Sequence, residues 1–183
     1  MPAPAAGLRQ AAMVLRGGGI VAYPTEAVFG LGCDPRNRRA VERLRRIKQR
    51  NRNKGLIVIA AHPAQLSVYV TSFAPRALAT WPGPHTWLLP ARPGTTRWVR
   101  GRSGSIAVRV TAHPQAAALC RSSGMAIVST SANRAGERPA RTRRDVMRRF
   151  GGLVGYVVPG RVGGRARPTP IADAASGQTV RAG

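Results

Sequence analysis

The cations around residue 48 are the first side chains whose types and spacing could perform chemistry. The segment of residues 36–54 carries ten basic residues and a single acid, Glu42, and its last cations include Lys48, Arg50 and Lys54. Such cations bind phosphate and carboxylate groups. Residues two apart do not share a helix face, so Lys48 and Arg50 converge only if a helix ends just before them and the chain continues extended. The alternative is a solvated basic surface.

A second group of polar side chains follows a short apolar segment. Ser131 and Asn133 come after residues 126–128 (AIV), which have the composition of a buried strand. Ligands of open α/β sheets bind beyond the carboxyl ends of strands, and residues two apart on an extended chain point the same way. The two side chains are therefore expected to contact one ligand. A turn, which Ser and Asn also favour, is the alternative.

Two further strands carry candidate polar residues. Thr25 follows a predicted strand over 20–23, and its alternative role is to close a turn or cap a helix. Ser105 and Arg109 lie on one face of a predicted strand, because side chains alternate along it. A buried arginine is costly unless paired, so Arg109 meets either an anionic ligand or an internal acid. The chain has only six acids, which favours the ligand.

Several kinds of site are excluded by what the sequence lacks. There is no Walker A motif, no G-x-G-x-x-G opening a helix after a strand, no convincing Ser–His–Asp order and no carboxylate pair. The three histidines are scattered and Cys33 and Cys120 form no C-x-x-C, so we identify no metal ligands among the side chains and expect a cytoplasmic location. We also expect no membrane span and no secretory signal. The site must be cationic and rich in hydroxyl groups.

Length and charge set the class of protein. The 183 residues fit one domain, and 43% hydrophobic residues suffice for a packed core. Thirty basic and six acidic residues give a net charge of +24. One interpretation is a mutational bias toward arginine codons; the other is a polyanionic partner, either a nucleic acid or nucleotide phosphates. The two are compatible, since such a surface binds RNA weakly and in a salt-dependent manner in either case.

The elements that must position these residues alternate between helices and strands. Apolar spacing and capping signals predict helices over 5–16, 37–48, 113–122 and 142–150, with short helical turns in 63–80. Strands are predicted over 20–23, 56–60, 87–89, 105–110, 126–128, 156–158, 171–172 and 179–180, and a loop over 25–35. The wholly apolar segment 56–60 is predicted to be covered on both faces. The fold class is α/β, with one twisted, mixed sheet.

Six segments occur together in an order known from one family. They are YPTEAVFGLGCD (23–34), IKQR followed by KGLIVIAA (47–61), WPGPHTWLLP (81–90), SIAVRVTAHP (105–114), VSTSAN (128–133) and PTPIAD (168–173). With them the chain resembles the YrdC family over about residues 7–183, and most of all its bacterial members that make threonylcarbamoyl-AMP. The resemblance implies a single α/β domain, residues 1–183, whose sheet is flanked by helices and forms an open, positively charged cavity.

The resemblance also implies an activity. L-threonine, bicarbonate and ATP, the last accompanied by Mg²⁺, would give threonylcarbamoyl-AMP and pyrophosphate. Partner proteins of the TsaB, TsaD and TsaE type would then use the product to modify the adenosine next to the anticodon of tRNA. Direct but weak contact with tRNA would fit the charge of the chain.

Particular residues match the functional positions of the family. Its K-x-R and S-x-N residues, implied to be catalytic and to bind ATP, correspond to Lys48, Arg50, Ser131 and Asn133. Its threonine-binding positions correspond to Thr25 and Arg109. Positions near the nucleotide correspond to Lys54, Ser105 and Thr169. Asn51 and His85 depart from the family pattern, which has a proline and an apolar residue there.

Two other functions compete with this one. A non-catalytic RNA-binding or ribosome-maturation factor would bind RNA in a salt-sensitive manner and would not turn over ATP. Against it, aromatic residues make up only 5% of the chain and no RNA-recognition signature is present. A carbamoyl-transfer domain of the hydrogenase-maturation type, which is related to YrdC, would require acylphosphatase and zinc-finger modules that this sequence does not contain.

Overall fold

The computed structural model describes residues 5–51 and 53–182, and Arg52 of the basic segment lies outside the described residues. The helices are α1 (Ala5–Arg16), α2 (Arg38–Lys48), α3 (Pro75–Thr80), α4 (Arg97–Arg100), α5 (Pro114–Ser123) and α6 (Arg143–Phe150), with a 3-10 helix at Pro63–Leu66. The strands are β1 (Val21–Pro24), β2 (Phe29–Gly32), β3 (Ile57–Ala60), β4 (Thr86–Pro90), β5 (Ser105–Val110), β6 (Ile127–Ser131), β7 (Tyr156–Val157), β8 (Ile171–Asp173) and β9 (Thr179–Arg181).

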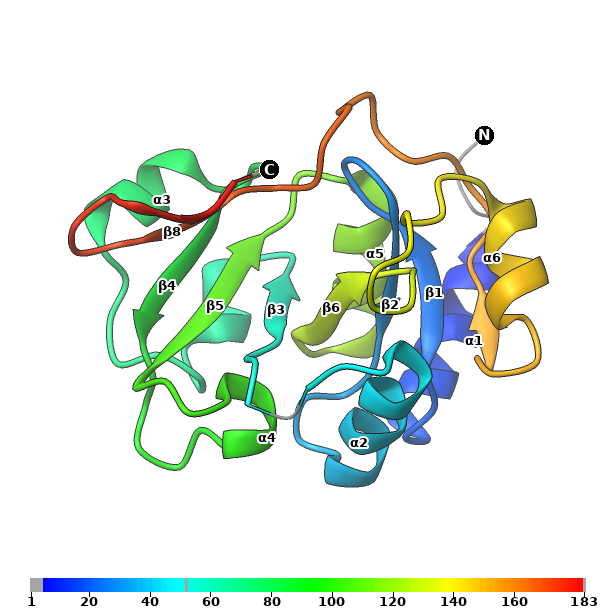
Figure 1. Ribbon diagram of the computed structural model, residues 1–183, viewed down its shortest axis with the longest axis horizontal. Coiled ribbons are helices and arrows are strands. Elements are labelled where there is room, and N and C mark those ends of the chain that lie inside the picture. The colour runs from blue at the N-terminus through cyan, green and yellow to red at the C-terminus, as the bar shows by residue number, and fades with distance from the viewer. Residues whose placement is uncertain (1–4, 52, 183) are drawn as a thin grey trace.

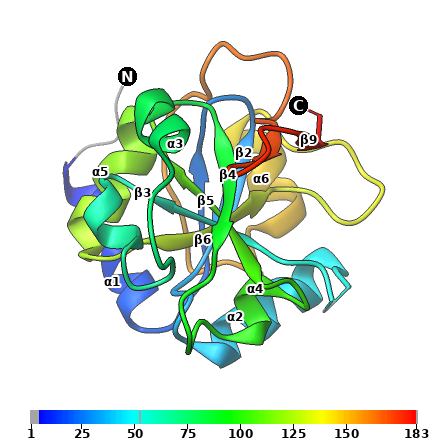
Figure 2. The same ribbon diagram turned by 90° about the vertical axis from the view of Figure 1, so that its left-hand side faces the viewer.

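The strands form one mixed sheet, as the alternation of elements predicts. Their order is β7-β1-β2-β6-β3-β5-β4-β8-β9. β1 with β7, β3 with β5 and β4 with β8 are parallel, and the remaining neighbours are antiparallel. Helices flank the sheet, and the strands change direction strongly from one end to the other (Figures 1 and 2).

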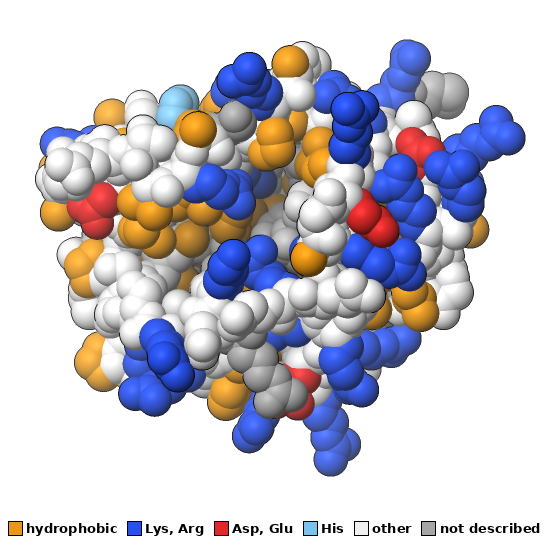
Figure 3. Space-filling model, in the orientation of Figure 1, with side chains coloured by type: hydrophobic (Ala, Val, Ile, Leu, Met, Phe, Trp, Pro, Cys, Tyr) orange, Lys and Arg blue, Asp and Glu red, His pale blue; other side chains and the backbone are white. Residues whose placement is uncertain are grey.

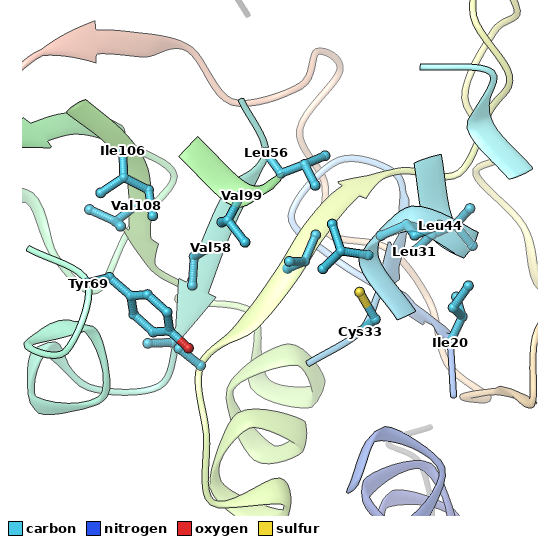
Figure 4. Close-up of a cluster of buried hydrophobic side chains, with 14 of the residues drawn as sticks. Ile20, Leu31, Cys33, Leu44, Leu56, Val58, Tyr69, Val99, Ile106 and Val108 are labelled. Carbon is cyan, nitrogen blue, oxygen red and sulfur yellow. The ribbon is translucent and has the colours of Figure 1, made fainter. Parts of the chain in front are cut away.

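One face of the sheet carries the larger core. Leu31 of β2, Val58 of β3 and Val108 of β5 belong to the same cluster of buried side chains (Figure 4). Leu44 of α2 and Val99 of α4 complete this cluster. Because the side chains of a strand alternate, the polar and small residues between these positions point to the opposite face.

The opposite face is covered by helices along only part of its length. Leu15 of α1 and Leu119 of α5 pack with Val21, Ile59 and Ile127 in a second buried cluster. Farther along the same strands the covering helices end, and this face lines the cavity with side chains that are buried, such as Ser129, or half-buried. Among these is Ile57, so the prediction that 56–60 is covered on both faces is wrong at this position.

The helix boundaries follow the capping signals in the sequence. Asn37 caps α2, and its side-chain oxygen accepts a hydrogen bond of 3.0 Å from the N–H of Ala40. Thr142 caps α6 and accepts from the N–H of Asp145 at 3.1 Å. Each cap satisfies an N–H group that the first turn of a helix leaves unpaired. These contacts confirm two predicted helix starts.

The segment 25–35 is not only a loop, as predicted, because it contains β2. Gly30 and Gly32 disfavour a strand by propensity, yet both lie in the sheet. A Cβ atom on Gly32 would lie 2.9 Å from a ring carbon of Tyr23 and 2.6 Å from the carbonyl oxygen of Val128. Glycine is therefore required here because the Tyr23 ring lies against the strand. β6 is also longer than predicted, since Ser131 still belongs to it.

Candidate active site

The C-terminal end of α2 turns the basic segment toward the sheet. Lys48 is the last helical residue, and Gln49 follows with φ 52° and ψ 40°, a left-handed conformation. The N–H of Gln49 donates to the carbonyls of Arg45 and Arg46, which closes the helix. A tight turn, instead of the extended chain that was predicted, thus brings Lys48 and Arg50 to one pocket.

Arg45 holds the loop after this turn in place. Its guanidinium is buried and donates to the carbonyl oxygens of Asn51 at 2.8 Å, Lys54 at 2.9 Å and Trp98 at 3.0 Å. The side chain of Lys54 is left exposed at the rim of the pocket. Arg45 was not predicted from the sequence, because a buried arginine within a basic helix has no local signal.

The K-x-R and S-x-N segments are joined by direct hydrogen bonds. Lys48 Nζ donates to the carbonyl oxygens of Ser131 and Asn133, the latter at 2.7 Å. Ser131 Oγ donates to Asn133 Oδ1 at 2.6 Å, and the N–H of Ala135 donates to the Lys48 carbonyl at 3.1 Å. Two segments more than eighty residues apart in sequence therefore form one unit.

Lys48 is held in an environment that weakens its charge. Burial, and then the neighbouring charge of Arg50, lower the pKa of Lys48 to about 8. An anion bound beside it would favour the charged ammonium and oppose this shift. The pocket that Lys48 shares with Arg50, Lys54, Ser131 and Asn133 has a volume of ≈ 350 Å³.

A second cavity of ≈ 290 Å³ adjoins this pocket, and Arg50 and Ser131 line both. It lies on the uncovered part of the sheet, where the surface is hollowed (Figure 3). The residues that line it come from several strands and from the C-terminal segment: Thr25, Ala27, Val28, Gly30, Arg50, Leu56, Ile57, Arg109, Ser129, Thr130, Ser131, Pro168, Thr169, Arg181 and Ala182. No carboxylate is among these described lining residues.

Three guanidinium groups, those of Arg50, Arg109 and Arg181, line the same cavity. Burial, and then the charge of Arg181, lower the pKa of Arg50. Burial, and then the charge of Arg109, lower the pKa of Arg181. Positive charges brought together in a partly desolvated cavity favour binding of an anion. Arg181 was not predicted from the sequence, because the short polar strand β9 gives no signal of its position in the sheet.

Arg109 forms an internal ion pair, which was the alternative to an anionic ligand in the prediction from sequence. Its Nη2 atom lies 3.4 Å from Oε2 of Glu26, and its Nη1 donates to the hydroxyl of Thr169. Arg109 nevertheless lines the cavity, as does Thr169. The ion pair therefore fixes a guanidinium that still faces the hollow.

The remaining predicted residues have different positions. Thr25 lines the cavity, but its hydroxyl donates to the carbonyl of Val28 at 2.7 Å and so also closes the turn that was its alternative role. Ser105 is the first residue of β5 and is not among the described residues that line either pocket. The structure thus brings together all the predicted site residues except Ser105.

Among residues 5–51 and 53–182, no group of three or more His, Cys, Asp or Glu side chains is placed to hold a metal ion. No helix in this part of the chain has the length and apolar character needed to cross a membrane. What the site offers is a row of cations and hydroxyls able to hold two anionic molecules side by side.

Known proteins resemble this chain over almost its full length. Threonylcarbamoyl-AMP synthase of Nitrosococcus oceani is 53% identical over 178 residues, which cover 95% of this chain and 96% of that protein. The protein of the same name from Methylobacillus flagellatus is 55% identical over 171 residues, covering 91% and 94%.

A solved structure has the same fold. P. abyssi Sua5, crystallised with L-threonine, superposes with a TM-score of 0.87 at 30% identity and matches 94% of this chain. This chain spans about half, 52%, of that longer protein. The sequence model of the Sua5/YciO/YrdC family, described as "Telomere recombination", matches residues 13–183. By this match and by the relatives above half identity, the chain belongs to the Sua5/YciO/YrdC family.

Proposed function

We propose that this chain is a threonylcarbamoyl-AMP synthase, which converts L-threonine, bicarbonate and ATP into threonylcarbamoyl-AMP and pyrophosphate. The observation that carries the proposal is the pair of adjoining pockets that share Arg50 and Ser131. One pocket is lined by Lys48, Arg50, Ser131 and Asn133, which we call the Lys48 unit, and the other is lined by Arg109. Two anionic substrates can therefore meet beside Arg50 and Ser131, which line both pockets. The full-length relatives that bear this enzyme's name support the same activity.

ATP is assigned to the pocket of the Lys48 unit. Its phosphates would be contacted by the cations Lys48, Arg50 and Lys54, and by the polar groups of Ser131 and Asn133. Such cations hold phosphate oxygens by charge-assisted hydrogen bonds. Mg²⁺ enters as part of the ATP substrate, bound to its phosphates. Ser105 is not included, because it lies outside the residues that line the pockets.

L-threonine is assigned to the adjoining cavity. Arg109 would receive the carboxylate of threonine, with Thr25 and Thr169 beside it. The solved Sua5 structure contains L-threonine, which supports an amino-acid site in this fold. Arg181 faces the same space and would add positive charge toward ATP.

The chemistry then requires positioning more than a nucleophilic side chain. The threonine amine and bicarbonate form a carbamate with loss of water. A carbamate oxygen attacks the α-phosphorus of ATP, the bond to the bridging oxygen breaks, and pyrophosphate leaves. Carbamate and triphosphate repel each other, and Lys48 and Arg50 offset that repulsion and stabilise the charge that develops on the leaving group. Holding the reactants together supplies most of the remaining acceleration.

The product implies partners that consume it. Threonylcarbamoyl-AMP is a mixed anhydride, and proteins of the TsaB, TsaD and TsaE type would transfer its threonylcarbamoyl group to the adenosine beside the tRNA anticodon. The cytoplasm is the compartment in which tRNA and ATP are both present, and it is the location that this function implies.

We also propose that the outer surface of α2 contacts RNA weakly. Arg39, Arg43 and Arg46 are exposed and spaced four and three residues apart, so they form one stripe along the helix. Arginine side chains gather over α6 and α2 (Figure 3). Such a stripe would bind the phosphate backbone without base specificity and would be sensitive to salt.

The test of the main proposal is product identification with each substrate omitted in turn. The complete mixture of the protein, ATP, bicarbonate and threonine is expected to release pyrophosphate and to yield threonylcarbamoyl-AMP by mass spectrometry. Omission of threonine or bicarbonate should abolish the product. Salt-sensitive RNA binding with no pyrophosphate release from the complete mixture would contradict the proposed enzymatic activity. It would favour the alternative function, a non-catalytic RNA-binding factor.

A further inference from the structure

Glu26 is a buried acid beside the cavity, and the proposed mechanism does not use it. The ion pair of Glu26 with Arg109 is the only one found among the described residues in which both side chains are nearly inaccessible, with exposures of 9% and 5%. The other four pairs lie at the surface. A buried carboxylate in a chain of net charge +24 must be compensated by specific contacts.

These contacts hold the Arg109 guanidinium from two sides. Thr111 Oγ1 donates to Glu26 Oε1 at 2.6 Å, which leaves Oε2 to face Nη2 of Arg109 at 3.4 Å. On the other side, Nη1 of Arg109 donates to the Thr169 hydroxyl. The Nε atom of Arg109 is buried and has no hydrogen-bond partner among the described residues. The group is thus fixed in position while part of its donor capacity is unused.

The backbone of Thr25 and Glu26 also holds the segment that leads to Pro168 and Thr169 in the cavity lining. The N–H of Gly163 donates to the Thr25 carbonyl at 2.9 Å, and the N–H of Arg165 donates to the Glu26 carbonyl at 3.2 Å. A Cβ atom on Gly163 would lie 2.6 Å from the Glu26 carbonyl oxygen, so the two backbones are in close contact. This segment passes across the top of the molecule in Figure 1 and continues to Thr169.

The carboxylate of Glu26 is ionised in this setting. Burial raises its pKa, but the charge of Arg109, the hydrogen bond from Thr111 and the nearby His113 together outweigh burial and lower it. The charged side chain can therefore act on Arg109 in two ways that have opposite consequences. It can orient the guanidinium for a ligand, or it can merely reduce the positive charge that the ligand meets.

We propose that Glu26 is a positioning residue for the amino-acid substrate, because it fixes the Arg109 guanidinium so that the part of this group that lines the cavity presents one geometry to the substrate carboxylate. The inference rests on the proposed function and assigns to Glu26 a role in threonine affinity alone. ATP binds to the Lys48 unit and is not expected to depend on Glu26.

The experiment compares Glu26→Gln with Glu42→Gln, a matched change in the surface pair with Arg38. We expect Glu26→Gln to raise KM for threonine by about tenfold or more, with KM for ATP and kcat within about twofold of wild type. Glu42→Gln should leave all three unchanged. If Glu26 only supported the fold, Glu26→Gln would lower the melting temperature and the fraction of active protein. KM for threonine would then not rise relative to KM for ATP.

A second variant keeps the proposal testable if Glu26→Gln does not fold. Thr111→Val removes one hydrogen bond to Glu26 and keeps its charge, and is expected to raise KM for threonine by about threefold. The proposal is overturned if the folded variants keep the wild-type KM for threonine, or if their KM for ATP rises by the same factor. It is also overturned if Glu26→Gln lowers KM for threonine, because that result is expected if Glu26 only reduces the positive charge that the ligand meets. A wild-type protein that makes no threonylcarbamoyl-AMP would instead overturn the proposed function.

Discussion

One face of the sheet is built in two ways, and β6 passes through both. Ile127 lies under α1 and α5 in a buried apolar cluster, whereas Ser129 and Ser131, on the same face of the same strand, line the cavities. β3 shows the same change in the opposite direction, since Ile59 is covered and Ile57 lines the hollow. The alternation of side chains is equal in both halves. What differs is whether a helix covers the face.

The difference shows how the fold provides a site. Polar side chains on a covered face would lose their hydrogen bonds to water, so the covered half is apolar. In the open half, hydroxyl and guanidinium groups line the two pockets, and Arg109, next to Ile59 in the register, lines the cavity although its side chain is only 5% exposed. The covered half therefore stabilises the sheet, and the open half is available for binding.

The largest effect is expected from removing the cation and the amide of the joined K-x-R and S-x-N segments. Lys48→Ala and Asn133→Ala should each reduce pyrophosphate release by about a hundredfold or more, because the first removes a cation that offsets the developing charge and the second removes the side-chain oxygen that accepts a hydrogen bond from it. Circular dichroism should show that both variants remain folded. Wild-type turnover in both variants would show that the reaction does not need these residues, and would contradict the assignment of the active site to the open half.

A paired substitution along β6 separates the two halves directly. Ile127→Ala, in the covered half, should lower the free energy of unfolding by about 2–4 kcal/mol through the cavity it leaves, with kcat per folded molecule retained. Ser131→Ala, in the open half, should lower turnover by about tenfold and change stability by less than about 1 kcal/mol. Chemical denaturation and steady-state kinetics on the same samples provide both quantities. Equal losses of stability at the two positions would contradict the division of this sheet face into a covered, stabilising half and an open, binding half.

The pH dependence of ATP binding sharpens the role of the open half. Because the pKa of Lys48 is lowered to about 8, its positive charge is present below this pH and is lost as the pH rises through it. Affinity for a fluorescent ATP analogue should therefore fall by up to about tenfold per pH unit above 8. Lys48→Arg stays charged and should bind with a flat profile over that range. An identical decline in both proteins would assign the titration to another group.

The smallest effect is expected outside both halves, on the α2 stripe. Replacing Arg39, Arg43 and Arg46 with alanine should weaken tRNA binding a few-fold and reduce the dependence of log K on log salt by about 0.9 per lost phosphate contact. Pyrophosphate release without tRNA should not change. Fluorescence anisotropy at several salt concentrations provides the slope, and an unchanged slope would place RNA contact elsewhere.

Local signals in the sequence were sufficient for most elements but not for the shape of the site. Asn37 and Thr142 mark helix starts through caps that depend on a few neighbouring residues, and both predictions are confirmed. β2 was missed because the reason for Gly32 is the Tyr23 ring, which comes from the neighbouring strand. Propensity contains no information about such a long-range contact.

Residue type and spacing suggested most of the predicted site residues, and the family resemblance alone suggested Thr169, but neither indicated the geometry of the site. Lys48 and Arg50 do converge, but through the left-handed Gln49, a conformation that a glutamine does not signal. Arg181 reaches the cavity only because β8 and β9 add to the edge of the sheet beyond β4. Its role depends on topology, which no motif in the last twelve residues encodes.

Amide hydrogen exchange with and without ATP and threonine tests most directly whether the open half of the sheet face is the active site. We predict slower exchange in peptides covering the loop after α2, the segment after β6 and residues 161–169, with no change in α1 and α5 over the covered half. Protection confined to the outer surfaces of α2 and α6, or none in the presence of both substrates, would contradict the account.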